Sequence, residues 1–408
     1  MAAHVDSAPG PDTSRAAIFR VFLKLGLTSF GGPVAHLGYF RDEFVQRRRW
    51  LDDAAYADLV ALGQFLPGPA SSQVGFALGV LRGGGPGGGL AAWLGFTLPS
   101  FIVMLAFALG MAAFAGAAVP PLAAGVLHGL KLAAVAVVAQ AVWGMGRSLA
   151  PDLRRALIAL AALAAVLVLG GSAGQLLAIA GGALAGLAWC RGSADSRQGT
   201  MAVPIGRRAG TAALASCVLL LAGLPLLADA AGQRLLSLFD AFYRAGALVF
   251  GGGHVVLPLL QAETVATGQV TNDAFLAGYG VAQALPGPLF AFAAFLGAAS
   301  EMAARPIAGA IVATCAVFLP GLLLMAGTLP FWDDLRRRPA ARHALQGVNA
   351  AVVGILAAAL AGPVWSGAVA GVADAAVALG GFLLLAAGKA RPWIVVALLA
   401  LAGALLGS

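Results

Sequence analysis

Phe30-Gly31-Gly32-Pro33 lies near the start of the chain, and Phe250-Gly251-Gly252-Gly253 repeats it 220 positions later. The first copy belongs to the stretch FLKLGLTSFGGPVAHL and the second to FYRAGALVFGGGHVVL. A second motif follows each copy, as QFLPGP at 64–69 and as QALPGP at 283–288. Because these motifs recur in the same order at a nearly constant offset, they indicate an internal duplication of the whole chain.

The composition is that of a membrane protein. Of the 408 residues, 60% are hydrophobic and only 10% are charged, whereas a soluble domain carries about 25% charged residues. Nearly every segment from Ala16 onwards is apolar over about 20 residues, the length that crosses a bilayer as a helix. The apolar runs are continuous, which excludes the period-two alternation of a β-barrel. The sequence therefore predicts an all-α polytopic membrane protein.

The charge distribution predicts how the two halves are oriented. The net charge is +8, and the arginines cluster in short loops between apolar runs, as the positive-inside rule describes. The basic loops of the first half are 41–49, 147–155 and 191–208, while those of the second half are 333–342 and 389–391. A loop that is basic in one repeat corresponds to a loop almost free of Lys and Arg in the other repeat. We therefore predict inverted structural repeats joined by an extra transmembrane span at 211–230.

Four segments follow from this organisation. We expect a disordered N-terminal tail at 1–14, a first repeat at 15–190 and a second, inverted repeat at 235–408. Residues 191–234 form a basic cytoplasmic linker together with the connecting span. In secondary transporters built from inverted repeats, the substrate site lies at the interface between the repeats.

The Gly- and Pro-rich motifs predict broken or re-entrant helices. Glycine and proline runs interrupt the helical hydrogen-bond ladder, and such backbone is tolerated in a membrane only inside protein or beside water. The helix N-termini at such breaks carry partial positive charge and exposed N–H groups that suit an oxyanion. The alternative is that the motifs serve close helix packing or kinks, but their paired recurrence favours function. The backbone candidates for substrate binding are Phe30, Gly31, Gly32, Pro33, Pro67, Gly68, Pro69, Gly251, Gly252, Gly253, Pro286, Gly287 and Pro288.

Several side chains near these breaks are also candidates. Lys24 and Arg244 occupy equivalent positions before the breaks, and a charge within a membrane segment is a functional hypothesis by default; snorkelling near a helix end is the alternative. Histidines can relay protons, or they can be satisfied polar residues of the interface. The remaining substrate-binding candidates are Gln64, Ser71, Ser72, His254 and Gln283, and the proton-coupling candidates are His36, His128 and Lys131. We expect no metal and no cofactor, since the three cysteines lack metal or redox spacing.

These residues resemble the chromate ion transporter family in its long, two-domain form. The resemblance rests on FGGPVAHLGYFRDEFV, GQFLPGPASSQ, FGGGHVVLPLL and GYGVAQALPGPLFAFAAFLG, and it covers about 15–408. It implies a secondary active transporter of the bacterial inner (plasma) membrane that exports chromate, a divalent tetrahedral oxyanion, from the cytoplasm. It further implies that the proton motive force drives export and that export confers chromate resistance. The expected partners are this oxyanion and the lipid bilayer, not nucleic acid, and a homodimer is left open.

Other functions are less compatible with the sequence. It contains no P-loop for an ATP-driven pump, and no Ser/His/Asp, paired-carboxylate or HExxH pattern for an enzyme. Two alternatives stay open, namely a transporter of another oxyanion such as sulfate and a passive anion channel.

The charge pattern makes a testable prediction about topology. Residues 41–49 and 333–342 should lie on the cytoplasmic side, and residues 112–121 and 261–273 on the outer side. Single cysteines introduced in these loops should therefore react with a membrane-impermeant thiol reagent from opposite sides. Labelling of 41–49 from outside would mean that the breaks are kinks within ordinary spans.

Overall fold

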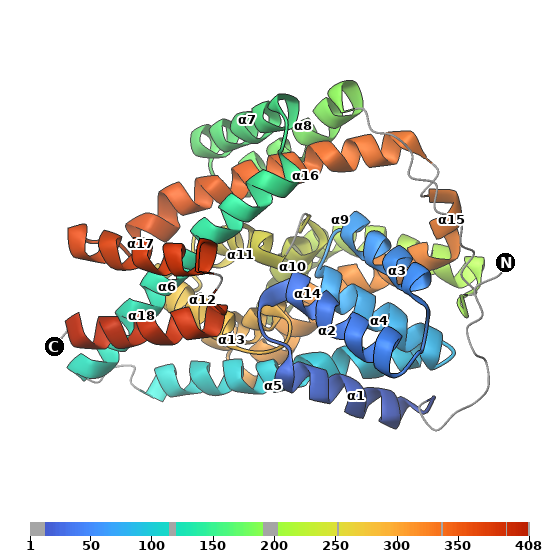
Figure 1. Ribbon diagram of the computed structural model, residues 1–408, viewed down its shortest axis with the longest axis horizontal. Helices are drawn as coiled ribbons and strands as arrows, with labels where there is room; N and C mark the ends of the chain where they lie inside the picture. Colours follow the sequence, from blue (N-terminus) through green and yellow to red (C-terminus); the bar gives the residue numbers. More distant parts are fainter. Residues whose placement is uncertain are drawn as a thin grey trace.

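The structure is a computed structural model that describes residues 13–113, 120–190, 203–250, 253–335, 338–388 and 390–406. Apart from Thr13 and Ser14, the predicted tail lies outside the described residues. The same is true of Gly251, Gly252, Lys389 and part of the predicted linker. Over the described ranges every regular element is a helix and none is a strand (Figure 1).

Within residues 13–113 and 120–190, the first half forms eight α-helices and one π-helical turn, η1 (Asp42–Arg47). Polar caps set several starts: the side chains of Ser14, Asp52 and Asp152 accept hydrogen bonds from the first turns of α1, α3 and α7, which satisfies backbone donors that would otherwise be unpaired. The α-helices are α1 (Arg15–Thr28), α2 (Gly32–Arg41), α3 (Asp53–Phe65), α4 (Ala70–Arg82), α5 (Pro86–Ala113), α6 (Pro121–Leu149), α7 (Leu153–Leu169) and α8 (Gly171–Trp189).

The second half repeats this order after one additional helix, α9 (Arg207–Ala231). Its elements are α10 (Arg234–Ala247), η2 (Gly253–Val255), α11 (Val256–Thr264), α12 (Asn272–Ala284), η3 (Leu289–Ala291), α13 (Phe292–Ala299), α14 (Pro306–Thr328), η4 (Leu329–Phe331), α15 (Trp332–Leu335), α16 (Pro339–Ala359), η5 (Leu360–Val364), α17 (Val372–Ala386) and α18 (Pro392–Leu406). As the sequence predicts, the helices are interrupted at both Phe-Gly-Gly motifs and at both Pro-Gly-Pro motifs.

Five helical stretches are long and apolar enough to cross a membrane. Within the described residues these are Pro86–Ala113, Pro121–Leu149, Arg207–Ala231, Pro306–Leu335 and Pro339–Val364. Large apolar side chains such as Ile102, Leu219 and Ile311 are exposed on them, as expected where lipid rather than water surrounds the helix. The prediction of an all-α polytopic membrane protein is confirmed.

Equivalent helices of the two halves make equivalent contacts. Helix α1 packs along α5 as α10 packs along α14, and α4 packs on α5 as α13 packs on α14. The terminal hairpins are exchanged between the halves: α7 and α8 pack on α16, whereas α17 and α18 pack on α6 (Figure 1). Each half therefore covers the long helix of the other, so neither half buries its surface alone.

Glycine makes the closest of these equivalent contacts. A methyl group at Gly26 would meet the carbonyl oxygen of Phe96 on α5 at 2.6 Å. A methyl group at Gly246 would meet the carbonyl oxygen of Val317 on α14 even more closely. Only a residue without a side chain allows the two backbones to approach this far.

The breaks of the two halves interlock through backbone hydrogen bonds. The N–H of Gly68, in the first Pro-Gly-Pro motif, donates to the carbonyl of Val249 at 2.7 Å. The N–H of Gly287, in the second, donates to the carbonyl of Ser29 at 2.9 Å. Val249 and Ser29 are themselves repeat equivalents, each directly preceding a Phe-Gly-Gly motif. This reciprocal exchange supports the predicted two-fold relation; the inverted orientation and the domain limits stay predictions.

Replacing either interlocking glycine should destabilise the protein. Gly68 and Gly287 have φ angles of 119° and 92°, and an added Cβ would lie 3.0 Å from Gly321 Cα and 2.9 Å from Ser100 Oγ, respectively. We expect Gly68→Ala and Gly287→Ala each to cost about 1–3 kcal/mol through backbone strain, measured as a lower melting temperature in detergent. Gly223→Ala, on α9 with no atom within 4 Å of the added methyl, is the control. Unchanged melting temperatures for both variants would contradict the interlock.

Candidate functional site

A cavity of about 270 Å³ lies where the breaks meet the end of the C-terminal hairpin. Its lining residues come from both halves. The first half contributes the first break and α6, and the second half contributes the second break, the end of α12 and the α17–α18 turn. The lining residues are Gly31, Gly32, Val137, Gln140, His254, Gln283, Leu385, Ala390 and Pro392. Four of them, Gly31, Gly32, His254 and Gln283, are predicted substrate-binding residues.

The first break reaches the cavity because two glycines bend the chain there. Gly31 and Gly32 have φ angles of 102° and 79°, which other residues adopt only with strain. Helix α2 begins at Gly32, and no side chain caps it. Pro33 has no N–H group, so the uncapped first turn offers the N–H groups of Gly32, Val34 and Ala35, the kind of backbone donors that bind anions.

Three helical segments begin at this cavity and two end there. Besides α2, the η2–α11 segment begins beside His254 and α18 begins at Pro392. Each of these N-termini contributes partial positive charge. Helices α12 and α17 end one residue after the lining residues Gln283 and Leu385, and their C-termini contribute partial negative charge. The backbone thus gives the cavity a modest preference for an anion.

No Asp, Glu, Lys or Arg lines the cavity, and its polar side chains are Gln140, His254 and Gln283. His254 Nδ1 lies 3.0 Å from the hydroxyl of Tyr279 on α12. The side chain of Gln283 lies close enough to the hydroxyl of Tyr279 to interact with it, but its buried amide nitrogen forms no hydrogen bond of standard geometry with the described residues. Because a buried donor without a partner is costly, this N–H group is suited to a ligand oxygen.

Arg391 is a charged residue of the α17–α18 turn and is next to the cavity lining in the chain. It lies between the lining residues Ala390 and Pro392, its side chain is exposed, and no described residue pairs with its guanidinium group. Contact between the rings of Phe30 and Trp393, whose centroids are 6.2 Å apart, holds this turn against the first break. Sequence reasoning missed Arg391, Gln140 and Tyr279 as site residues; an arginine in a turn between two apolar runs was the available signal.

Other predicted residues surround the cavity without lining it. Pro67, Pro69, Pro286 and Pro288 flank the interlocking glycines, and the side chain of Gln73 donates to the carbonyl of Pro67 at 2.8 Å. A methyl group added to Gly253 would lie 3.0 Å from the ring of Pro33, so the two Phe-Gly-Gly breaks are adjacent.

A buried polar cluster lies behind the first break. His36 is 1% exposed, and its Nδ1 lies 3.3 Å from the hydroxyl of Ser71. Ser72 is equally buried, and its hydroxyl has no partner among the described residues. The structure thus brings His36, Ser71 and Ser72 together on α2 and α4, away from the residues that line the cavity.

The remaining candidates lie elsewhere. Lys24 and Gln64 are exposed, and Gly251 and Gly252 are outside the described residues. His128 Nε2 lies 2.8 Å from a carboxylate oxygen of Asp374, and Lys131 forms an ion pair with Asp273 at 3.0 Å, so both side chains are bound to the second half. Arg244 is paired with two carboxylates. Their predicted roles stay predictions.

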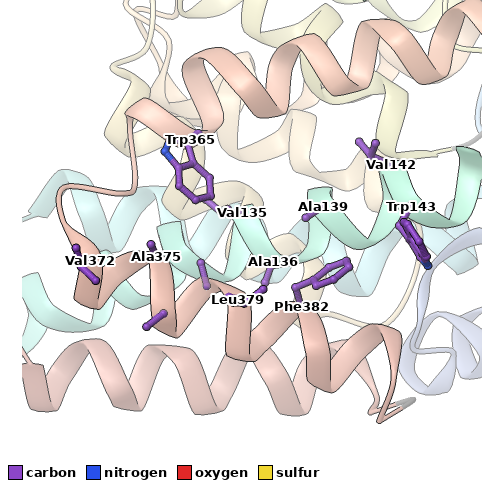
Figure 2. A pocket seen from close by; sticks show the side chains of 12 residues that line it. Val135, Ala136, Ala139, Val142, Trp143, Trp365, Val372, Ala375, Leu379 and Phe382 are labelled. Carbon is purple, nitrogen blue, oxygen red and sulfur yellow. The ribbon is translucent and has the colours of Figure 1, made fainter. Parts of the chain in front are cut away.

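A larger cavity of about 510 Å³ is unsuited to an oxyanion. Figure 2 shows its lining, which comes from α6, α17 and Trp365 and is almost entirely apolar. Val372 and Trp143 lie at its two ends, with Trp365, Ala139 and Phe382 between them. Transfer of a divalent anion to such surroundings without hydrogen bonds is prohibitive, whereas a lipid chain would be well solvated there.

The comparisons with known proteins all indicate the same family. The sequence profile of the family described as chromate transporter matches residues 16–187 and 236–404. A chromate transport protein of Pseudomonas aeruginosa is 34% identical over 355 residues, covering 85% of this chain and 80% of that protein. One from Cupriavidus metallidurans is 30% identical over 345 residues, covering 83% and 80%. A probable chromate transport protein of Synechococcus elongatus is 29% identical over 352 residues, covering 86% and 84%. No solved structure matches the chain.

The cavity should lose its ligand when Gly32 gains a methyl group. In Gly32→Ala the φ angle of 79° becomes strained, so the first turn of α2 should shift its N–H groups. Purified wild-type protein should melt at a higher temperature in the presence of a tetrahedral dianion such as chromate or sulfate, since a ligand of the folded state stabilises it. Gly32→Ala should lose that increase, while Gly38→Ala, on the same helix with open space around it, should keep it. Equal increases in all three proteins would exclude the break as the anion site.

Proposed function

Because the chain belongs to the chromate transporter family, we propose that it is a secondary active transporter that exports chromate from the cytoplasm. The proposed driving force is the proton motive force, and the proposed outcome for the cell is chromate resistance. The observation that carries the proposal is the cavity at the breaks, with three helix N-termini, a buried amide donor and Arg391 next to its lining in the chain.

The chemistry of this cavity fits a tetrahedral dianion. Four oxygens pointing in different directions can accept hydrogen bonds from α2 backbone N–H groups, from Gln283 and from Gln140. Neutral donors together with one arginine compensate only part of a double negative charge, so the anion is held but can still leave, as transport requires. Sulfate has the same shape and charge, and discrimination between the two anions has to come from the distances between these donors.

A charge difference between the halves supports the outward direction. The equivalent positions 20/240, 24/244 and 43/263 carry Arg, Lys and Glu in the first half and Asp, Arg and Glu in the second. These formal charges sum to +1 in the first half and −1 in the second. With the first set at the cytoplasmic mouth, as the predicted topology requires, chromate is attracted from inside and its return from outside is opposed.

Transport into sealed vesicles tests the proposal. Purified protein in liposomes with an acidic interior should accumulate labelled chromate above its external concentration, and collapse of the pH gradient should release it. Uptake that only equilibrates would identify a passive channel instead. Accumulation of sulfate in preference to chromate would reassign the substrate, and no flux of either anion would reject the proposal.

Removal of the charge of Arg391 should weaken substrate binding. A hydrogen bond to a charged group contributes about 2 kcal/mol, so Arg391→Gln should raise the chromate concentration for half-maximal uptake about thirtyfold. Arg391→Lys should restore part of the affinity, since it keeps the charge but not the planar group. The matched control is Arg305→Gln, an exposed arginine that also directly precedes a helix-starting proline. Unchanged affinity in Arg391→Gln would remove this residue from the site.

A further inference from the structure

A second cavity, of about 240 Å³, lies beside the hairpin that carries the second break. Residues of α8, α9, α10 and α11 line it. Its polar side chains are Gln175 of α8, Arg244 of α10 and Glu263 of α11, and the remaining lining residues are apolar. Neither the oxyanion site nor the family comparisons assign a role to this cavity.

Arg244 joins Glu263, which also lines this cavity, to Asp240, which does not line it. Its Nη1 and Nη2 atoms donate to the two carboxylate oxygens of Glu263 at 3.2 and 3.0 Å, and its Nε atom donates to Asp240 Oδ2 at 3.0 Å. Asp240 and Glu263 are only 5% and 9% exposed. The cluster thus contains one guanidinium group and two buried carboxylates. An excess negative charge in such surroundings strongly favours uptake of a cation.

Two buried oxygen atoms at the cluster have no partner among the described residues. One is Oδ1 of Asp240, and the other is the amide oxygen of Gln175, a side chain that is 5% exposed. The amide nitrogen of Gln175 is already bound to the carbonyl of Pro258 at 3.0 Å, which fixes its oxygen as the acceptor. The unused groups are therefore acceptors, which a positively charged ligand or a proton satisfies and an anion does not.

The other arginines of the surrounding helices, Arg207 and Arg208 at the start of α9 and Arg234 at the start of α10, are exposed, and Arg207 pairs with Asp334. The sequences of α8 and α14 contain no Asp, Glu, Lys, Arg or His. Helix α9 contributes Asp229, which acts electrostatically on Asp240 and disfavours its negative charge further. Arg244 on α10 is the cation of the cluster, and it pairs with the carboxylate of Glu263 on α11.

The equivalent residues of the first half have the opposite character. Glu43 occupies the position equivalent to Glu263, but Arg47 and Arg48 pair with it at 3.0 and 2.7 Å. Although burial acts to raise the pKa of Glu43, the hydrogen bonds and charges of these two arginines hold the pKa below its usual value. Arg20 stands where the second half has Asp240. The excess of carboxylates is thus specific to the second half.

We propose that Asp240 and Glu263, bridged by Arg244, bind the proton whose entry drives anion export. This inference rests on the proposed function. A hydronium ion entering through the cavity transfers its proton to a carboxylate oxygen, so one O–H bond forms, one water molecule is released, and the cluster gains one positive charge.

The position of the cluster explains how protonation would reach the oxyanion site. Asp240 and Arg244 precede the second break on α10 and Glu263 follows it on α11, so the ion pair between Arg244 and Glu263 connects the two arms of this hairpin. Val249, whose carbonyl accepts the hydrogen bond from Gly68, and His254, which lines the oxyanion cavity, lie between them in the chain. Weakening of the ion pairs by a proton therefore loosens the segment that holds one side of the substrate cavity.

Two flux measurements on the same proteoliposomes test the proposal with Asp240→Asn, Glu263→Gln and the equivalent control Glu43→Gln. Counterflow of labelled against unlabelled chromate requires no net proton movement, whereas accumulation driven by an acidic interior does. Both second-half variants should retain counterflow but lose about tenfold or more of the pH-driven accumulation, as expected when a proton-relay carboxylate is neutralised. Glu43→Gln should retain both activities.

The outcomes separate this proposal from the proposed function. Wild-type protein without chromate counterflow would reject the transport function itself. Second-half variants that accumulate chromate like the wild type, or that lose counterflow and accumulation equally at normal membrane abundance, would overturn the proton site. Wild-type accumulation that follows a Na⁺ gradient and ignores the pH gradient would also overturn it.

Discussion

The arrangement of the molecule depends on one constraint, which is that backbone groups freed by a helix break cannot stay unpaired in a membrane. Each unsatisfied N–H or carbonyl group costs several kcal/mol in hydrocarbon. The chain satisfies them by exchange: Gly68 donates to Val249 and Gly287 donates to Ser29. Because each Pro-Gly-Pro break donates to the residue before the Phe-Gly-Gly break of the other half, the breaks are held together, and the position of the cavity between them follows from that requirement.

The exchange also divides the backbone donors into two groups. The N–H groups of Gly68 and Gly287 are used within the protein, whereas the uncapped start of α2 at Gly32 is left for a ligand. The repeated scaffold is thus nearly symmetric, but the chemistry placed on it is not. His254, Gln283 and the α17–α18 turn meet at one cavity, while the equivalent glutamine of the first half, Gln64, is exposed. The cavity at the breaks thus takes residues from both halves, whereas the proposed proton site lies on α10 and α11 of the second half alone.

The sequence predicted the helical membrane fold, the positions of all four breaks and four of the cavity residues. It could do so because glycine and proline act locally on the backbone. Each motif also occurs twice, so the second copy supports the interpretation of the first. It could not predict that Arg391 lies beside the first break, because hairpin exchange between halves is a long-range packing result. Nor could it predict that Arg244, a candidate positive charge for the substrate, is held by Glu263 as well as by Asp240. The i,i+4 pair with Asp240 was visible in the sequence, but the contact with α11 was not.

The most direct test of the central claim is an electron cryo-microscopy structure of the protein in lipid nanodiscs with and without chromate. The account predicts chromate density in the cavity between the start of α2, Gln283 and the α17–α18 turn, within hydrogen-bonding distance of the Gln283 amide. Density at Lys24 or in the Arg244 cavity, with the cavity at the breaks empty, would contradict it.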